Sequence, residues 1–221
     1  MRPIQRSIHA VLTGDLVASA ESTPESVDAA VRALETAAGQ VGLWTGRDTH
    51  FTRFRGDGWQ LYLDTPDLSL AAVLLLVATL RARRTELETR IAVGFGTINK
   101  LGETGNGLAD ASGEAFTLSG RALDEMPRHR RIALAGPGVV QGWHDALFDL
   151  VLWIAGRWTP EQAEAVSLAL DPRERRTQAE IAGMLGVTRQ AVQARLSGAG
   201  WDALAGAVAA VAAHDWGDPD G

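Results

Sequence analysis

The chain has 221 residues, a formal net charge of −6 and no cysteine, and 46% of its residues are hydrophobic. These values allow one large or two small domains, and they exclude disulfides and thiolate zinc sites. They also exclude nucleic-acid binding through a uniformly basic surface, so any such binding must be local. The N-terminus lacks the apolar core of a signal peptide, and the apolar runs are too short to span a bilayer. We therefore expect a cytoplasmic protein.

The first elements alternate between strands and a helix. Residues 7–13 form an apolar run that predicts a buried strand. Thr23 followed by Pro24 marks the start of an amphipathic helix, with the threonine as its N-cap. Two strand-like runs, 49–55 and 59–64, flank an Asp-Gly pair that is typical of a tight hairpin.

The next segments extend this order to β-α-β-β-α-β-α-β. Residues 65–84 predict a helix that is apolar on nearly all sides and therefore buried. Residues 90–98 predict a strand whose small residues Ala92, Gly94 and Gly96 share one face, which suits close approach of another element. A glycine-rich loop, a helix and a short strand are expected at 99–112, 113–126 and 131–135. The order predicts an α+β fold with a ferredoxin-like core.

A second unit is expected after the Gly-Pro-Gly turn at 136–138, because only helical patterns follow it. The predicted boundaries are 1–136 for the α+β domain and 139–214 for an all-α domain. The tail at 215–221 is expected to fray. The aromatic residues expected in the core or at the domain interface are Trp143, Trp153 and Trp158.

Two carboxylates each follow a glycine at the end of a predicted strand. Asp15 follows Gly14, and Asp57 follows Gly56 in the hairpin. If the first two strands are parallel and joined by a right-handed crossover, both carboxylates lie at one edge of the sheet. Mg²⁺ takes one or two carboxylates together with phosphate oxygens, so this edge predicts a Mg²⁺ or Mn²⁺ site for a phosphate ligand. The alternative is that both residues only shape turns.

Several of these stretches resemble the class III nucleotidyl cyclases. The family's helix reads Gly-Asp-x-Val-Asn-x-Ala-x-Arg, and residues 113–121 here read Gly-Glu-Ala-Phe-Thr-Leu-Ser-Gly-Arg. The strand before Asp15, the hairpin at 54–59 and the strand at 90–98 resemble the corresponding strands of the family. The resemblance covers roughly residues 7–135 and implies a nucleotidyl-cyclase-like domain.

The resemblance also implies roles for single residues. Asp15 and Asp57 would hold the metal, and Arg121 would act on the developing phosphate charge from the partner subunit of a homodimer. Thr117 stands where the family has Asn. The cofactor-binding residues that the resemblance implies are Gly14, Gly56 and Arg53. Arg53 stands where the family has the Lys or Glu that reads the base.

A closer match over the whole first domain is the SatD family of bacterial proteins, which has a first strand ending Gly-Asp, a Gly-Asp hairpin and a glycine-rich fourth strand. We expect a regulator whose first domain binds a nucleotide or related phosphate ligand with Mg²⁺. One alternative is an active nucleotidyl cyclase, or a synthase of a cyclic or oligomeric nucleotide, with Asp15 and Asp57 as metal ligands. Another is an interaction module without a ligand.

Residues 177–196 have the spacing of a helix-turn-helix and resemble those of sigma-factor region 4 and winged regulators. The side chains expected to face a major groove are Thr188, Arg189, Gln190, Gln193 and Arg195. Arginine suits guanine and glutamine suits adenine, so the predicted partner is duplex DNA. Residues 159–204 hold five arginines against six acidic residues, so we expect a weak binder or a homodimer.

Overall fold

The computed structural model describes residues 7–46, 50–54, 56–102, 107–172 and 174–217. Its α+β part contains β1 (His9–Leu16), α1 (Pro24–Thr45), β2 (Phe51–Phe54), β3 (Gly58–Leu63), α2 (Ser69–Ala82), β4 (Thr89–Gly96), α3 (Glu114–Glu125) and β7 (Ile132–Ala135). Short elements between them are the 3₁₀ turns η1 (Ser19–Glu21) and η2 (Pro66–Leu68), and the strands β5 (Ile98–Lys100) and β6 (Ser112–Gly113). The predicted order of the larger elements is confirmed. The predicted loop at 99–112 differs, because its ends pair as β5 and β6.

The main sheet has the strand order β2-β3-β1-β4-β7. β1 is antiparallel to both β3 and β4, β2 is antiparallel to β3, and β7 runs parallel to β4. β1 and β2 therefore point the same way, as the crossover argument predicts, with β3 between them. This arrangement places the end of β1 and the β2–β3 turn at the same edge of the sheet.

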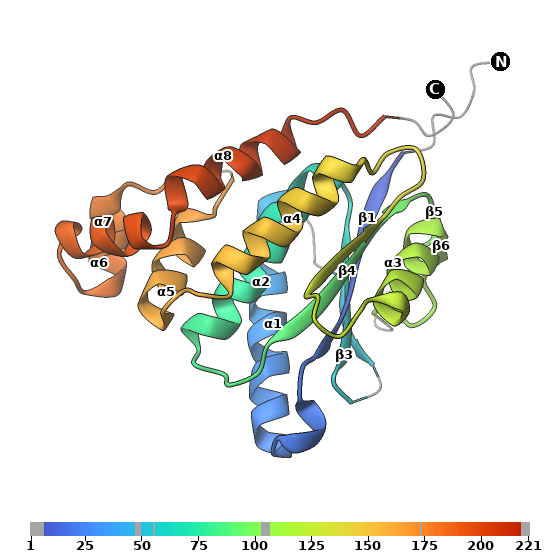
Figure 1. Cartoon of the computed structure of the whole chain (residues 1–221), viewed down its shortest axis with the longest axis horizontal. Coiled ribbons are helices and arrows are strands. Elements are labelled where there is room, and N and C mark those ends of the chain that lie inside the picture. The colour runs from blue at the N-terminus through green and yellow to red at the C-terminus, as the bar shows by residue number, and fades with distance from the viewer. Residues whose placement is uncertain (1–6, 47–49, 55, 103–106, 173, 218–221) are drawn as a thin grey trace.

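Helices cover both faces of the sheet. α1 and α2 lie on one face, and α3 lies on the other (Figure 1). Alternate residues of β1 serve the two faces: Leu12 joins the large core under α1 and α2, whereas Val11 packs with Tyr62 and Ala115 under α3. α2 is buried on nearly all sides, as predicted, because α1, α4 and α5 surround it.

The C-terminal part is entirely helical among the described residues. Its elements are α4 (Gly142–Ala155), α5 (Pro160–Ala169), α6 (Gln178–Leu185), α7 (Arg189–Gly198) and α8 (Trp201–Ala212). Threonines start α5 and α6: Thr159 and Thr177 each accept a hydrogen bond from the third helical residue. The predicted boundary at 136–138 falls in a turn, but one hydrophobic core runs across it from α1 and α2 to α8.

Two of the three tryptophans expected inside lie at the surface. Trp158 is buried and donates a hydrogen bond to the Ala199 carbonyl at 2.9 Å. The side chains of Trp143 and Trp153 are 42% and 58% exposed, so the expectation is wrong for them. Trp153 instead lies under the guanidinium of Arg157, 3.4 Å from the ring centroid.

The start of the tail is packed rather than frayed. The ring of Trp216 is only 6% exposed and stacks on Phe95 of β4 at a centroid distance of 4.6 Å. His144 and His214 contact the same ring. Burial, followed by the charge of the neighbouring His214, lowers the pKa of His144 below its ordinary value. The prediction of a frayed tail is therefore wrong for 215–217, and the remainder lies outside the described residues.

Candidate functional site

The site predicted around Asp15 is built by the pairing of β1 with β4. Asp15 is opposite Arg90 in the register, so both side chains leave the same face of the sheet. Arg90 binds both carboxylate oxygens, with its Nε 2.9 Å from Oδ1. The Thr89 hydroxyl donates to the Asp15 carbonyl at 2.8 Å and accepts from the Trp59 indole at 3.1 Å. These bonds hold Asp15 in a fixed position.

Asp57 occupies the turn between β2 and β3. The turn depends on Gly56, whose φ of +80° favours glycine. The carboxylate of Asp57 accepts a hydrogen bond from the hydroxyl of Ser19, which lies in η1, four residues after Asp15. The loop that leaves β1 and the hairpin that carries Asp57 are therefore in direct contact. The two predicted carboxylates share one edge of the sheet.

Charge is concentrated at this edge. The pKa of Arg90 is raised, first by its hydrogen bond with Asp15 and then by the negative charges of Asp15, Asp124 and Asp57. Carboxylates therefore outnumber guanidiniums around Arg90. Neighbouring carboxylates repel each other unless a cation or a proton intervenes. The local charge therefore favours a further cation.

The donor set can be compared with the needs of Mg²⁺. Within the described residues, no group of three or more potential metal-ligating side chains forms a ready cage. Mg²⁺ does not need one, because it usually takes one or two carboxylates and completes its shell with water and phosphate oxygens. Asp15 and Asp57 are ligands of this kind, and Arg90 already binds both oxygens of Asp15.

The other residues implied for ligand binding already have partners or packing roles. The Arg53 side chain donates to the Gly56 carbonyl at 2.6 Å and to the Asp28 carboxylate at 2.7 Å. Gly14 lies against the Trp59 ring, where an added Cβ would be 2.4 Å from the ring. Packing thus accounts for Gly14, and the turn accounts for Gly56, without a ligand.

Thr117 and Arg121 are not brought to Asp15 within one chain. α3 faces the sheet through Ala115, Ser119 and Leu123, and the Ser119 hydroxyl is 2.7 Å from that of Thr13. Thr117 and Arg121 are one helical turn apart on the outward face, and both are exposed. Any role for them at the carboxylates would need a second copy of the chain.

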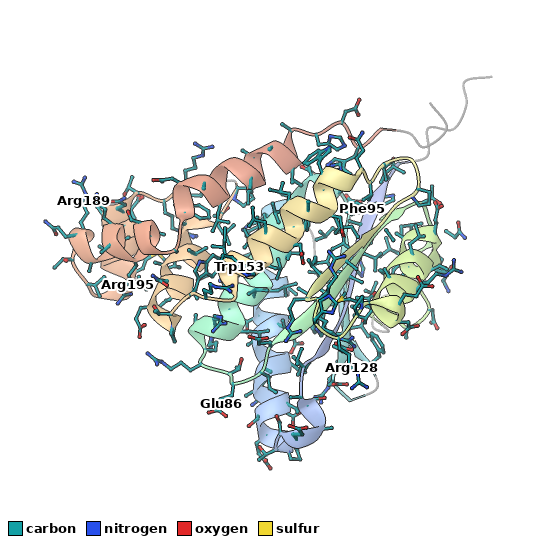
Figure 2. All side chains as sticks on the ribbon, viewed as in Figure 1. Glu86, Phe95, Arg128, Trp153, Arg189 and Arg195 are labelled. Atoms are coloured by element: carbon teal, nitrogen blue, oxygen red, sulfur yellow. The ribbon has the colours of Figure 1, made fainter. Side chains whose placement is uncertain are left out.

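The predicted DNA-reading residues lie at the far end of the molecule from α3 (Figures 1 and 2). α6 and α7 pack together and are joined by residues 186–188. Thr188 caps α7 by accepting from the Ala191 amide at 3.2 Å, and Arg189, Gln190 and Gln193 are exposed. Arg195 differs, because it forms an ion pair with Glu164 of α5 at 3.3 Å. Of the two arginines expected to face the groove, Arg189 alone has no ion pair with the residues that the structure describes.

Ser19, Thr89, Arg90 and Asp124 were missed by the sequence reasoning. The position of Arg90 could have been found from the resemblance, since it opens the strand that was compared with the cyclases. Its pairing with Asp15 depends on the β1–β4 register, and the contact of Ser19 with Asp57 depends on the path of the loop. The spacing of residues in the sequence predicts neither of these two contacts.

No protein-family model matches the sequence, and no curated protein matches it significantly. Among solved structures, the guanylyl cyclase Cya2 is similar with a TM-score of 0.41 and 17% identity, over 58% of this chain and 75% of that chain. The adenylyl cyclase CyaB from P. aeruginosa gives 0.40 and 15%, over 59% and 77%. A bacterial light-regulated adenylyl cyclase gives 0.40 and 14%, over 59% and 43%. Similarity this low does not identify a function.

No helix among the described residues is long and apolar enough to cross a membrane.

Proposed function

We propose that the sheet edge at Asp15 and Asp57 binds a nucleotide or a related phosphate ligand together with Mg²⁺ or Mn²⁺. The observation that carries the proposal is the hydrogen bond from Ser19 to Asp57, which joins the loop after Asp15 to the hairpin. The excess of carboxylates over guanidiniums around Arg90 favours a divalent cation, and the sequence resemblance to nucleotidyl cyclases suggests the nucleotide.

Each residue has a defined task in this proposal. Asp15 and Asp57 hold the cation, and a bound Mg²⁺ would orient phosphate oxygens and offset their negative charge. Arg90 keeps Asp15 oriented through its two hydrogen bonds and adds positive charge beside the phosphates. Turnover as a cyclase would need a second copy of the chain to supply Arg121, so the alternative of an active nucleotidyl cyclase requires a homodimer.

Asp57→Asn is expected to weaken Mg²⁺-dependent binding of nucleoside triphosphates by about tenfold or more, because a neutral amide is a poorer Mg²⁺ ligand than a carboxylate and even outer-shell changes cost about 10–100-fold in metal affinity. Asn suits the same turn, so the fold should survive. Calorimetric titrations of each triphosphate, with and without Mg²⁺, measure the change. Resolving the products by mass in the same samples separates binding from turnover.

Two variants control this experiment. Asp202→Asn removes an exposed carboxylate at the start of α8 and should leave the titration unchanged. Asp15→Asn should weaken binding like Asp57→Asn, but it also deprives Arg90 of a charged partner and should lower stability. Identical isotherms for wild type and both site variants, or no binding by wild type at millimolar ligand, would contradict the proposal.

We also propose that α6 and α7 form a DNA-binding helix-turn-helix, so that the chain acts as a regulator. The favouring observation is the exposed polar row at the start of α7: the hydroxyl of Thr188 and the side chains of Arg189, Gln190 and Gln193. Helix N-terminal residues in this position contact base edges in helix-turn-helix proteins. The low local positive charge makes a weak or dimeric binder the expected form.

Gln193→Ala is expected to cost about 1–3 kcal/mol of DNA affinity and to relax sequence preference. The measurement is fluorescence anisotropy on duplexes selected by the wild-type protein from a randomised pool. Glu164→Ala is the informative partner, because it releases Arg195 from its ion pair and should strengthen binding to all sequences alike. Equal affinity of wild type for every duplex, or no effect of Gln193→Ala, would refute base reading by α7.

A further inference from the structure

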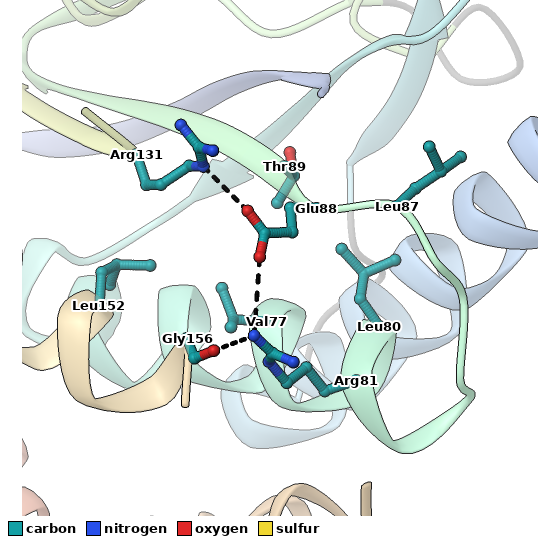
Figure 3. A pocket seen from close by; sticks show the side chains of 9 residues that line it. All are labelled: Val77, Leu80, Arg81, Leu87, Glu88, Thr89, Arg131, Leu152 and Gly156. Atoms are coloured by element: carbon teal, nitrogen blue, oxygen red, sulfur yellow. Dashed lines mark hydrogen bonds and ion pairs between the residues drawn. The ribbon is translucent and has the colours of Figure 1, made fainter. Parts of the chain in front are cut away.

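A small cavity lies at the junction of the sheet with the C-terminal helices. It opens between α2, the start of β4, the residue before β7 and the end of α4, and its volume is about 50 Å³ (Figure 3). A water molecule needs roughly 10–15 Å³ by this kind of measure, so the cavity has room for several waters or a few carbon atoms. Most of its wall is apolar, formed by Val77, Leu80, Leu87 and Leu152.

The mouth of the cavity holds a carboxylate between two arginines. One oxygen of Glu88 is 3.0 Å from Nε of Arg131, and the other is 3.6 Å from Nη2 of Arg81 (Figure 3). Arg81 also donates to the Gly156 carbonyl at the end of α4, and Arg131 donates to the Arg128 carbonyl at 3.1 Å. Both guanidiniums are therefore oriented toward Glu88 by other contacts.

The charges at the mouth do not balance. Arg81 and Arg131 carry two positive charges against the one negative charge of Glu88. The Glu88 side chain is 53% exposed, so water already reaches its carboxylate. An ion pair this accessible contributes little stability, and another carboxylate could replace it at small cost.

We propose that this cavity binds a small monocarboxylate with a short apolar body of a few carbon atoms. The carboxylate takes the place of Glu88 between Arg81 and Arg131, where planar guanidiniums suit its two oxygens. The apolar body covers Leu80 and Leu152. The ligand then contacts the sheet part and α4 at once, and it should raise the thermal stability of the protein that binds it.

The test is a titration of propionate, followed by amide NMR shifts and calorimetry, into the full chain and three variants. Glu88→Gln removes the competing carboxylate and is expected to strengthen propionate binding by about two- to fivefold, because the ligand no longer has to replace an exposed ion pair. Arg131→Gln is expected to abolish binding. Arg84→Gln is the matched control: it removes a nearby arginine that pairs with Glu161 outside the cavity, and should change nothing.

1-Propanol, which has the same length of carbon chain without the carboxylate, provides the second control. It is expected to bind more weakly than propionate to wild type and to be insensitive to Glu88→Gln. The proposal is overturned if Glu88→Gln leaves propionate affinity unchanged, if 1-propanol binds as well as propionate, or if the shifted amides lie away from α2, β4 and α4. A purely structural role of Glu88 predicts lower stability of Glu88→Gln without any gain in affinity.

Discussion

Gly94→Ala is expected to lower the free energy of unfolding by about 1–3 kcal/mol, as is typical of overpacking a close contact. A Cβ at Gly94 would lie 2.2 Å from the Ala115 carbonyl oxygen and 2.5 Å from the Ser119 amide nitrogen. Both are backbone atoms of α3, so the whole helix would have to move away from the sheet. That movement would also carry Asp124 away from Arg90.

Gly120→Ala is the control for this substitution. Gly120 lies in α3, the helix that packs on Gly94 of β4, and nothing lies within 4 Å of the position of an added Cβ. The helix should gain about 0.5–1 kcal/mol from the alanine. Urea denaturation of both variants gives the comparison through the transition midpoint. Equal midpoints for the two variants would show that α3 does not pack on β4 as described.

Trp216→Ala is expected to cost about 3–5 kcal/mol of stability, the usual range for emptying a buried aromatic site. Its ring is almost fully buried and stacks on Phe95, while its indole donates to the Val211 carbonyl at 3.2 Å. Removing the ring would leave a cavity next to β4, bounded by the imidazoles of His144 and His214, and this cavity causes the loss of stability.

Trp153→Ala tests whether this cost depends on burial rather than on residue type. Trp153 is 58% exposed, and its recorded stacking partner is the exposed side chain of Arg157, a contact that contributes about 0.5–1 kcal/mol at such sites. The same urea measurement applies to both tryptophan variants. If Trp216→Ala were as mild as Trp153→Ala, the tail would not be anchored in the core.

Much of the fold was predictable from local signals. The caps at Thr23, Thr159 and Thr177 start helices because their hydroxyls satisfy amide groups of their own first turn. The order of strands and helices followed from periodicity and glycine-rich turns. The shared edge of Asp15 and Asp57 followed from chain direction alone, because a parallel β1 and β2 must end on the same side.

The predictions from sequence are wrong where packing between distant segments decides whether a side chain is buried or paired. Trp153 stands in an apolar run and Trp216 among polar residues, yet the packing of α4 and the tail on the rest of the chain exposes the first and buries the second. Arg195 has the spacing of a groove-facing residue, but α5 places Glu164 beside it. The Asp15–Arg90 pair depends on a strand register that joins residues far apart in sequence.

The sequence by itself determined where the elements begin, which residues are glycine for backbone reasons and which carboxylates end their strands, because these depend on neighbours a few residues away. The tertiary structure alone decided which polar and charged side chains contact each other. Arg90 reaches Asp15, Ser19 reaches Asp57, and Glu88 lies between Arg81 and Arg131. Such pairs form between elements whose separation in space is set by the packing of the whole core, and no local pattern records that distance.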